Sequence, residues 1–353
     1  MSHVQVNASE RIETHETEKK APTRIRLSLF LAIGVLLIVL LVLLSVALGA
    51  ASIELSTTWQ AFTQFDSDNT QHQIIRSLRL PRTLADIIVG SSLAVTGAMM
   101  QATTRNPMAD SGLMGISSGA AFAVALSMAL FPGQSHIQLI IFACIGAAVS
   151  TTITYGLAMM GKRPMSPQRL ILSGIAVSML FSALSSLISL QFHLGQSMTY
   201  WFSGGSASVN WDDLQIIAPF FFITIIMSIS IGRGLTLINL GDEIAAGLGA
   251  KVSIIKLVTV ILVFVLSALS VMLVGPISFV GLIVPHVVRF FVGIDYRAVI
   301  PSSIVYGAVF LLLADLVGRL INRPNETPLG IIFAMIGVPF FLFLSNRTRR
   351  EFE

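Results

Sequence analysis

The sequence predicts an all-α protein that crosses a membrane many times. Of its 353 residues, 54% are hydrophobic and only 11% are charged, and the mean hydropathy is +0.83. Soluble domains carry about 25% charged residues, so apolar side chains this numerous cannot all be buried in a soluble core. Long apolar stretches recur along the whole chain. Because a backbone in lipid has to satisfy its own hydrogen bonds, such stretches are expected to be helices.

The first long apolar stretch runs from residue 27 to about residue 51. It fits a spanning helix of about 20 residues. A cleaved signal peptide is the alternative, because small residues stand at 47–50, but its apolar core would be only about 7–15 residues long. Counting this stretch, we expect about ten spans; eight or twelve satisfy the same parity. The other nine stretches lie near 84–101, 113–131, 137–160, 170–190, 214–231, 254–274, 277–292, 298–317 and 329–345.

Charged residues orient these spans. Residues 1–26 carry both signs of charge and no apolar face, so we expect a disordered cytoplasmic tail before a transmembrane domain over 27–346. Residues 347–353 form a basic cytoplasmic end. Lys and Arg also collect in alternate loops, whereas acidic residues at 66, 68, 212 and 213 fall in the other loops. Since basic residues favour the cytoplasmic side, both ends are expected to be cytoplasmic.

Three arginines do not follow this charge pattern, because they are expected on the outer side of the membrane. Arg79 and Arg82 precede a span that should enter from outside, and Arg319 ends the ninth span, again outside. One interpretation pairs Arg82 with Asp86 and Arg319 with Asp315, each at i,i+4 spacing. A second has the arginines bind lipid phosphates. A third is a basic patch that docks an acidic partner protein, because charge complementarity sets register and association rate.

A short cytoplasmic segment over 241–249 is too weakly apolar to span the membrane. Asp242 and Glu243 suit the beginning of a helix, and Gly249 suits its end. The segment is either an ordinary surface helix or a lever that a motor subunit contacts. The chain lacks a G-x-x-x-x-G-K-[ST] nucleotide loop, so we do not expect an enzyme, and ATP hydrolysis would require another chain. With Cys144 as the single cysteine, the sequence predicts neither a disulfide nor a metal site.

An ordered set of motifs over roughly residues 27–346 resembles the FecCD family. Its members are permease subunits of type II ABC importers for ferric siderophores, haem and cobalamin. One motif alone would carry little weight, but the ordered set is specific. The motifs are Arg79-LPR, Gly90-SSLAVTGAMMQATTRNPMADSGLMGISSGA, Trp201-FSGGS, Leu237-INLGDEIAAGLGA, Gly275-PISFVGLIVPHVVR, Ala314-DLVGR, Glu326-TPLG and Gly337-VPFF.

The resemblance implies a type II ABC importer permease fold in a bacterial plasma membrane, with ten helices in each of two paired permeases. The second permease would be identical or a sister chain. Two cytoplasmic ATPases would bind Mg-ATP, this chain itself would bind no cofactor or nucleic acid, and an extracytoplasmic binding protein would deliver the substrate. The arginines that match Arg79, Arg82 and Arg319 would face acidic residues of that binding protein. The ATPases would contact Gly241, Asp242, Glu243, Ala245, Ala246, Leu248 and Gly249.

The expected cargo is a ferric siderophore, and cobalamin or haem import by the same architecture is the alternative. An ion-coupled secondary transporter and a membrane scaffold without transport are the alternatives from other classes. We expect a large, weakly polar path that neither grips the chelate nor strips its metal, and no iron ligand from this chain. The side chains expected to line it are Met99, Met100, Gln101, Thr103, Ser117 and Ser118.

Overall fold

The protein is a bundle of helices in which ten apolar helices account for the ten predicted spans. The computed structural model describes residues 24–49, 53–160, 167–322 and 325–350, and every regular element within these ranges is helical. Seven helices are long and apolar enough to cross a membrane, and three shorter apolar helices complete the set. The ten are α1 (Arg24–Ala47), α4 (Leu80–Thr104), α5 (Ile116–Leu130), α6 (His136–Met159), α7 (Pro167–Gln191), α9 (Trp211–Ser230), α12 (Val252–Val274), α13 (Val280–Val292), α14 (Tyr296–Ile321) and α15 (Leu329–Arg350).

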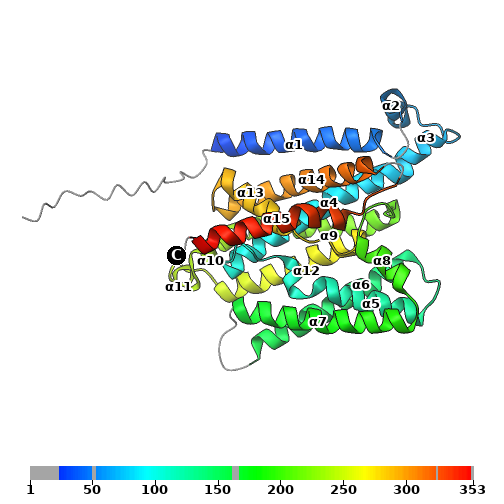
Figure 1. Cartoon of the computed structure of the whole chain (residues 1–353). Helices are drawn as coiled ribbons and strands as arrows, with labels where there is room; N and C mark the ends of the chain where they lie inside the picture. Colours follow the sequence, from blue (N-terminus) through cyan, green and yellow to red (C-terminus); the bar gives the residue numbers. More distant parts are fainter. Residues whose placement is uncertain (1–23, 50–52, 161–166, 323–324, 351–353) are drawn as a thin grey trace, which may run out of the picture.

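Short helices occupy the two ends of the bundle (Figure 1). One end, which we call the α8 end, carries α2 (Leu55–Thr63), α3 (Thr70–Gln73), the π-helical segment Ile74–Arg79 and α8 (Gly195–Ser203). The opposite end, the α11 end, carries α10 (Gly232–Leu240) and α11 (Asp242–Gly247). A 3-10 turn, Ser111–Met114, joins α4 to α5.

The first helix begins, and the last helix ends, at the α11 end (Figure 1). This is the arrangement that an even number of crossings requires. Helix α1 begins at Arg24, three residues before the predicted boundary. Residues 1–23 of the expected tail and residues 351–353 of the expected basic end lie outside the described residues.

Helix α4 forms the centre of the bundle, and nearly all its side chains are buried. Small residues let the neighbouring helices come close. Gly90 lies against the backbone of Gly307 on α14, and Gly97 lies against the backbone of Gly281 on α13. A Cβ atom at either α4 position would overlap the backbone of the facing helix. At these positions the glycines serve close packing, the usual role of small residues between membrane helices.

The outer helices expose their apolar side chains. On α1, for example, Leu36 and Leu43 are more than half exposed, and on α9 Phe220 and Phe222 are too. Such rows of exposed leucine and phenylalanine suit contact with lipid tails rather than with water. The chain is therefore a multi-pass membrane protein, as its composition predicts.

Helix α13 is shorter than the predicted stretch at 277–292. Its 13 residues rise about 20 Å, which is less than the roughly 30 Å of a bilayer core. The helix begins only at Val280, because Phe279 before it adopts a left-handed backbone conformation with φ +73°. Non-helical backbone precedes it and packs inside the protein, where the Gly205 N–H donates to the Val274 carbonyl at 2.8 Å. Irregular backbone at membrane depth is tolerated when protein surrounds it.

Candidate functional site

The three arginines lie together at the α8 end, where Asp315 joins two of them. The Arg82 Nη2 atom lies 2.7 Å from Asp315 Oδ1, and Arg319 Nη2 lies 2.7 Å from Asp315 Oδ2. The predicted i,i+4 pair between Arg319 and Asp315 is therefore confirmed. The alternative pair of Arg82 with Asp86 is wrong, because Arg82 reaches across from α4 to α14 instead. Its Nη1 atom also donates to Glu326 at 2.8 Å.

Two of the three arginines are buried and bind the end of α1. The Arg79 Nη1 atom donates to the carbonyls of Val46 and Ala47, both at 2.8 Å, and Arg319 Nη1 donates to the Ser45 carbonyl at 2.9 Å. The last four carbonyls of a helix lack partners within the helix, so these guanidinium groups satisfy them. Arg79 and Arg319 are 7% and 2% exposed, so their guanidinium groups lie inside this subunit, and their contact with a binding protein stays a prediction.

Arg82 is the member of the cluster that reaches the surface, and it does so beside an acid. Its side chain is 13% exposed, whereas the carboxylate of Glu326 is 37% exposed. The accessible part of the cluster is therefore an ion pair rather than a bare positive patch. An acidic group from another molecule would meet Arg82 by taking the place of Glu326. Sequence reasoning missed Glu326 as Arg82's partner because the two lie 244 positions apart in the chain.

At the opposite end of the bundle, α11 protrudes between two turns, each of which contains a glycine. Gly241 before it and Gly249 after it have φ values of +124° and +81°, which favour glycine. Ala245 is fully buried and anchors the helix, whereas Ile244 and Leu248 expose 54% and 62% of their surface. The predicted residues Glu243, Ala246 and Gly249 are also exposed, and Asp242 is half-buried. The segment thus presents an apolar tip to the outside.

Ion pairs and hydrogen bonds fix the base of this segment. The Lys256 Nζ atom on α12 lies 2.5 Å from the Asp242 carboxylate. The Thr236 hydroxyl on α10 donates to Asp295 at 3.0 Å and accepts the Tyr296 N–H at 2.9 Å, which joins α10 to the beginning of α14. Burial raises the pKa of Asp295, but hydrogen bonds from Arg297 and Thr236 outweigh it and bring the pKa below its usual value. An ionised Asp295 therefore holds the two helices together.

The residues predicted to line a path are not among those that line the two cavities described below. Met99, Met100 and Gln101 are buried in the core around α4, and Thr103, Ser117 and Ser118 are partly exposed. The Thr103 and Ser118 hydroxyls donate to backbone carbonyls of their own segments. Met99 and Met100 lie where α4 packs against α9, α12, α13 and α14, and their lining of a path stays a prediction.

Gln101 instead joins two helices. Its Nε2 atom donates to the Gly281 carbonyl at 3.0 Å, and its Oε1 atom accepts from Arg289 at 2.5 Å. Both partners lie on α13. The Gln101 amide thus satisfies a buried carbonyl and a half-buried guanidinium at once, which is a packing role rather than a lining role.

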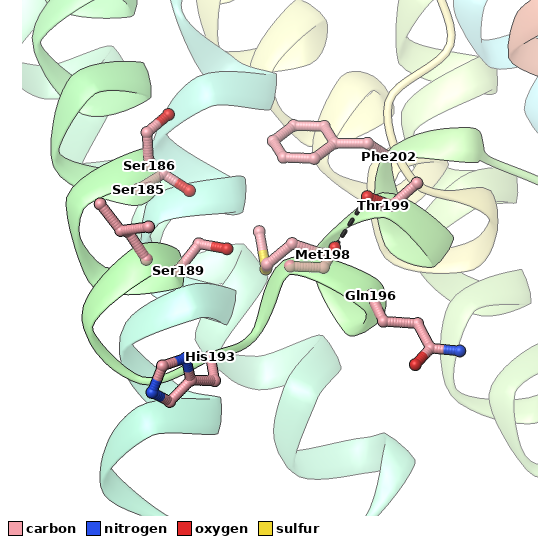
Figure 2. A pocket seen from close by; sticks show the side chains of 10 residues that line it. Ser185, Ser186, Ser189, His193, Gln196, Met198, Thr199 and Phe202 are labelled. Atoms are coloured by element: carbon pink, nitrogen blue, oxygen red, sulfur yellow. Dashed lines mark hydrogen bonds between the residues drawn. The ribbon is translucent and has the colours of Figure 1, made fainter.

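A cavity of about 600 Å³ lies between the end of α7 and α8 (Figure 2). Serines of α7 stand on one side of it, and Met198, Thr199 and Phe202 of α8 stand on the other. Sequence reasoning missed this cavity. The available signal was the row of serines at 182, 185, 186 and 189, whose spacing of three and four residues places them along one side of an otherwise apolar helix.

A second cavity, of about 830 Å³, lies on the other side of α8. It is bounded by residues of α6 and α12, by the segment 326–329, and by Arg82. Helix α8 therefore stands between two cavities at the end of the bundle that carries the arginine cluster. The chain turns sharply after α8, at Gly204, whose φ is +64°.

Comparison with protein families shows to which family this chain belongs. A family model described as the FecCD transport family matches residues 36–347. The chain belongs to the FecCD transport family. The match covers all ten apolar helices, apart from the first half of α1 and the last three residues of α15. The predicted resemblance is therefore confirmed.

Two FecCD relatives from Bacillus subtilis (strain 168) are permease proteins of iron import. The Iron(3+)-hydroxamate import system permease protein FhuB is 43% identical over 90% of this chain and 83% of its own length. The Iron-uptake system permease protein FeuB is 42% identical over 89% of this chain and 94% of its own length. A solved ABC transporter in an inward-facing conformation superposes with a TM-score of 0.79, at 29% identity, and covers 91% of this chain and 99% of its own. The predicted type II importer permease fold is confirmed.

Proposed function

We propose that this FecCD chain is a permease subunit of an ATP-driven importer that carries a ferric siderophore into the cytoplasm. The observation that carries the proposal is the 43% identity, over 90% of the chain, to an iron(3+)-hydroxamate import permease. The ten apolar helices agree with this activity, because a permease has to span the membrane. Transport of cobalamin or haem by the same architecture is the alternative cargo.

The assembly in this proposal contains a second permease, identical or a sister chain, and two ATPases that bind Mg-ATP. The apolar tip of α11 supports an ATPase contact, because exposed Ile244 and Leu248 would be covered by a partner. This assignment places the α11 end and both chain ends in the cytoplasm. The α8 end then faces outside, where an extracytoplasmic binding protein delivers the chelate.

The proposed cycle uses the ATPases to shift the permease pair between two states. ATP binding closes the motor subunits and moves α11, and its rigid base passes the movement to α10, α12 and α14. A ligand shifts such an equilibrium only through its different affinity for the two states, and here ATP supplies that difference. We place part of the path at the cavity between α7 and α8.

Docking of the binding protein is proposed at Arg82. In the free subunit, Glu326 holds the Arg82 guanidinium in a partly exposed ion pair. An acidic side chain of the binding protein would exchange with Glu326 and form the same charge-assisted hydrogen bonds. Arg79 and Arg319 would support the site by holding the end of α1 beside it rather than by touching the partner.

A pair of opposite variants tests this docking. In Glu326→Gln, Arg82 loses its competing acid, so we expect the binding protein to bind about two- to fivefold more tightly, as for a partly exposed ion pair worth up to about 1 kcal/mol. In Arg82→Gln, whose amide can still donate to the buried Asp315, we expect loss of stimulated ATP hydrolysis, with assembly intact. Binding is measured by titrating the reconstituted importer with its binding protein. Unchanged affinity in both variants would contradict docking at Arg82.

A further inference from the structure

The cavity between α7 and α8 is polar but carries no fixed charge. Ten described residues line it, and none of them is Lys, Arg, Asp or Glu. Its polar groups are hydroxyls, one amide and one imidazole, from Ser185, Ser186, Ser189, His193, Gln196 and Thr199. These stand beside the apolar Leu190, Met198 and Phe202. The lining thus combines neutral polar groups with apolar contact.

Three of the four hydroxyl groups of this lining, those of Ser185, Ser186 and Thr199, donate their hydrogens to backbone carbonyls. The Thr199 hydroxyl donates to the Gly195 carbonyl at 2.7 Å (Figure 2), and the Ser186 hydroxyl donates to the Ser182 carbonyl at 2.9 Å. A hydroxyl has one hydrogen and two lone pairs. Once the hydrogen is bound to the preceding helical turn, the oxygen offers only acceptors. The walls therefore favour ligands that bring donors.

In the nearby arginine cluster, two of the three arginines are paired with acids. Asp315 binds both Arg82 and Arg319, and Glu326 binds Arg82 a second time. A multiply charged anion that leaves water needs cations or hydrogen-bond donors to replace its hydration. The lining holds no cation, and its donors are few: the Gln196 amide, the His193 imidazole and the Ser189 hydroxyl. A neutral ligand with N–H groups loses less hydration free energy than such an anion, and its N–H groups can donate to the hydroxyl oxygens of the lining.

We infer that the cavity between α7 and α8 passes electroneutral, donor-bearing ferric chelates and rejects multiply anionic ones. A ferric trihydroxamate is of the first kind, since three hydroxamate anions balance Fe³⁺. A ferric tris-catecholate is of the second kind, with a net charge of three negative units. The volume of about 600 Å³ falls within the roughly 300–1,000 Å³ of small-ligand sites. This inference rests on the proposed siderophore transport and specifies its substrate class.

The test compares two chelates that share a backbone and differ in their chelating groups and therefore in net charge. One tripodal backbone is built with three hydroxamates and with three catecholates, and both are loaded with radiolabelled iron. Uptake is measured into proteoliposomes that contain the permease pair, its ATPases and its binding protein. We expect the neutral chelate to enter at least about tenfold faster, because charge effects within a few ångströms in protein exceed this factor.

A charge variant separates the cavity from the binding protein as the source of this preference. In Ser189→Lys, we expect the catecholate-to-hydroxamate uptake ratio to rise by about tenfold, because an ammonium now faces the cavity. Ser189→Asn, which adds size without charge, is the matched control and should leave the ratio unchanged. Thr199→Lys repeats the test from the α8 wall if the first variant fails to assemble.

The outcomes distinguish the inference from the function on which it rests. A hydroxamate preference that shifts with the introduced lysine supports the inference. Equal uptake of the two chelates, or a ratio that neither lysine changes, overturns the inference and leaves siderophore transport standing. If neither chelate enters while the binding protein still stimulates ATP hydrolysis, siderophore transport itself fails, and the inference fails with it.

Discussion

Asp315 is the residue on which the arginine cluster depends. It is 1% exposed and holds Arg82 from α4 and Arg319 from its own helix, and these in turn reach Glu326 and the end of α1. The pair within α14 could be predicted, because helical spacing brings positions 315 and 319 together. The contacts to α4 and α1 could not, because they depend on how helices far apart in sequence pack.

The first prediction at this scale concerns Arg319. In Arg319→Ala, Asp315 stays buried with one cation fewer, and the Ser45 carbonyl loses a donor. Breaking a buried ion pair by removing one partner costs about 3–5 kcal/mol, so we expect a clear fall in the thermal unfolding midpoint of the purified protein in detergent. Tryptophan fluorescence during heating measures it.

Arg297→Ala is the matched control for that experiment. Its guanidinium pairs with Asp295 at 2.9 Å, but the side chain is 65% exposed, and solvent screens such pairs. We expect little change in its unfolding midpoint. If the Arg319 and Arg297 variants both have the same unfolding midpoint as the parent protein, the buried cluster does not stabilise the fold as we describe.

At the scale of elements, apolar length predicted all ten helices, because each stretch that spans lipid must satisfy its own backbone. The details that position the sites were harder to predict. The late beginning of α13 depends on the left-handed Phe279, and the cavities beside α8 depend on the turn at Gly204. The short α11 could be predicted from its acidic beginning and its final glycine, because caps are local signals.

The second prediction concerns the exposed tip of α11. In the double variant Ile244→Asp with Leu248→Asp, two charges replace apolar side chains that the ATPase is proposed to cover. Burying one such side chain is worth about 1.5–3 kcal/mol, so we expect the ATPase to bind at least about tenfold more weakly. Co-purification and binding-protein-stimulated ATP hydrolysis measure the effect.

Ile294→Asp is the control for α11. This isoleucine is 64% exposed and lies in the turn between α13 and α14, outside the predicted contact segment. We expect the ATPase to bind this variant as it binds the parent protein. Equal loss in both variants would show that the contact is not specific to α11, and normal flux in the double variant would remove its lever role.

At the scale of the whole molecule, the bundle has two unlike ends joined by a tightly packed α4. A charged cluster, α8 and two cavities lie at one end, and a protruding apolar helix on a fixed base lies at the other. The glycine contacts of α4 with α13 and α14 form a continuous packed connection between them. The outer helices expose apolar side chains to lipid. This division suits a permease that receives cargo at one end and is driven from the other.

The measurement that tests the account most directly is uptake of a radiolabelled ferric siderophore into proteoliposomes that contain the permease pair and its ATPases. We predict uptake only with the binding protein outside and Mg-ATP on the ATPase side. Uptake should stop with an ATPase variant that cannot hydrolyse ATP, and a protonophore or sodium ionophore should not change it. Uptake driven by an ion gradient, with the ATPases absent, would contradict the account.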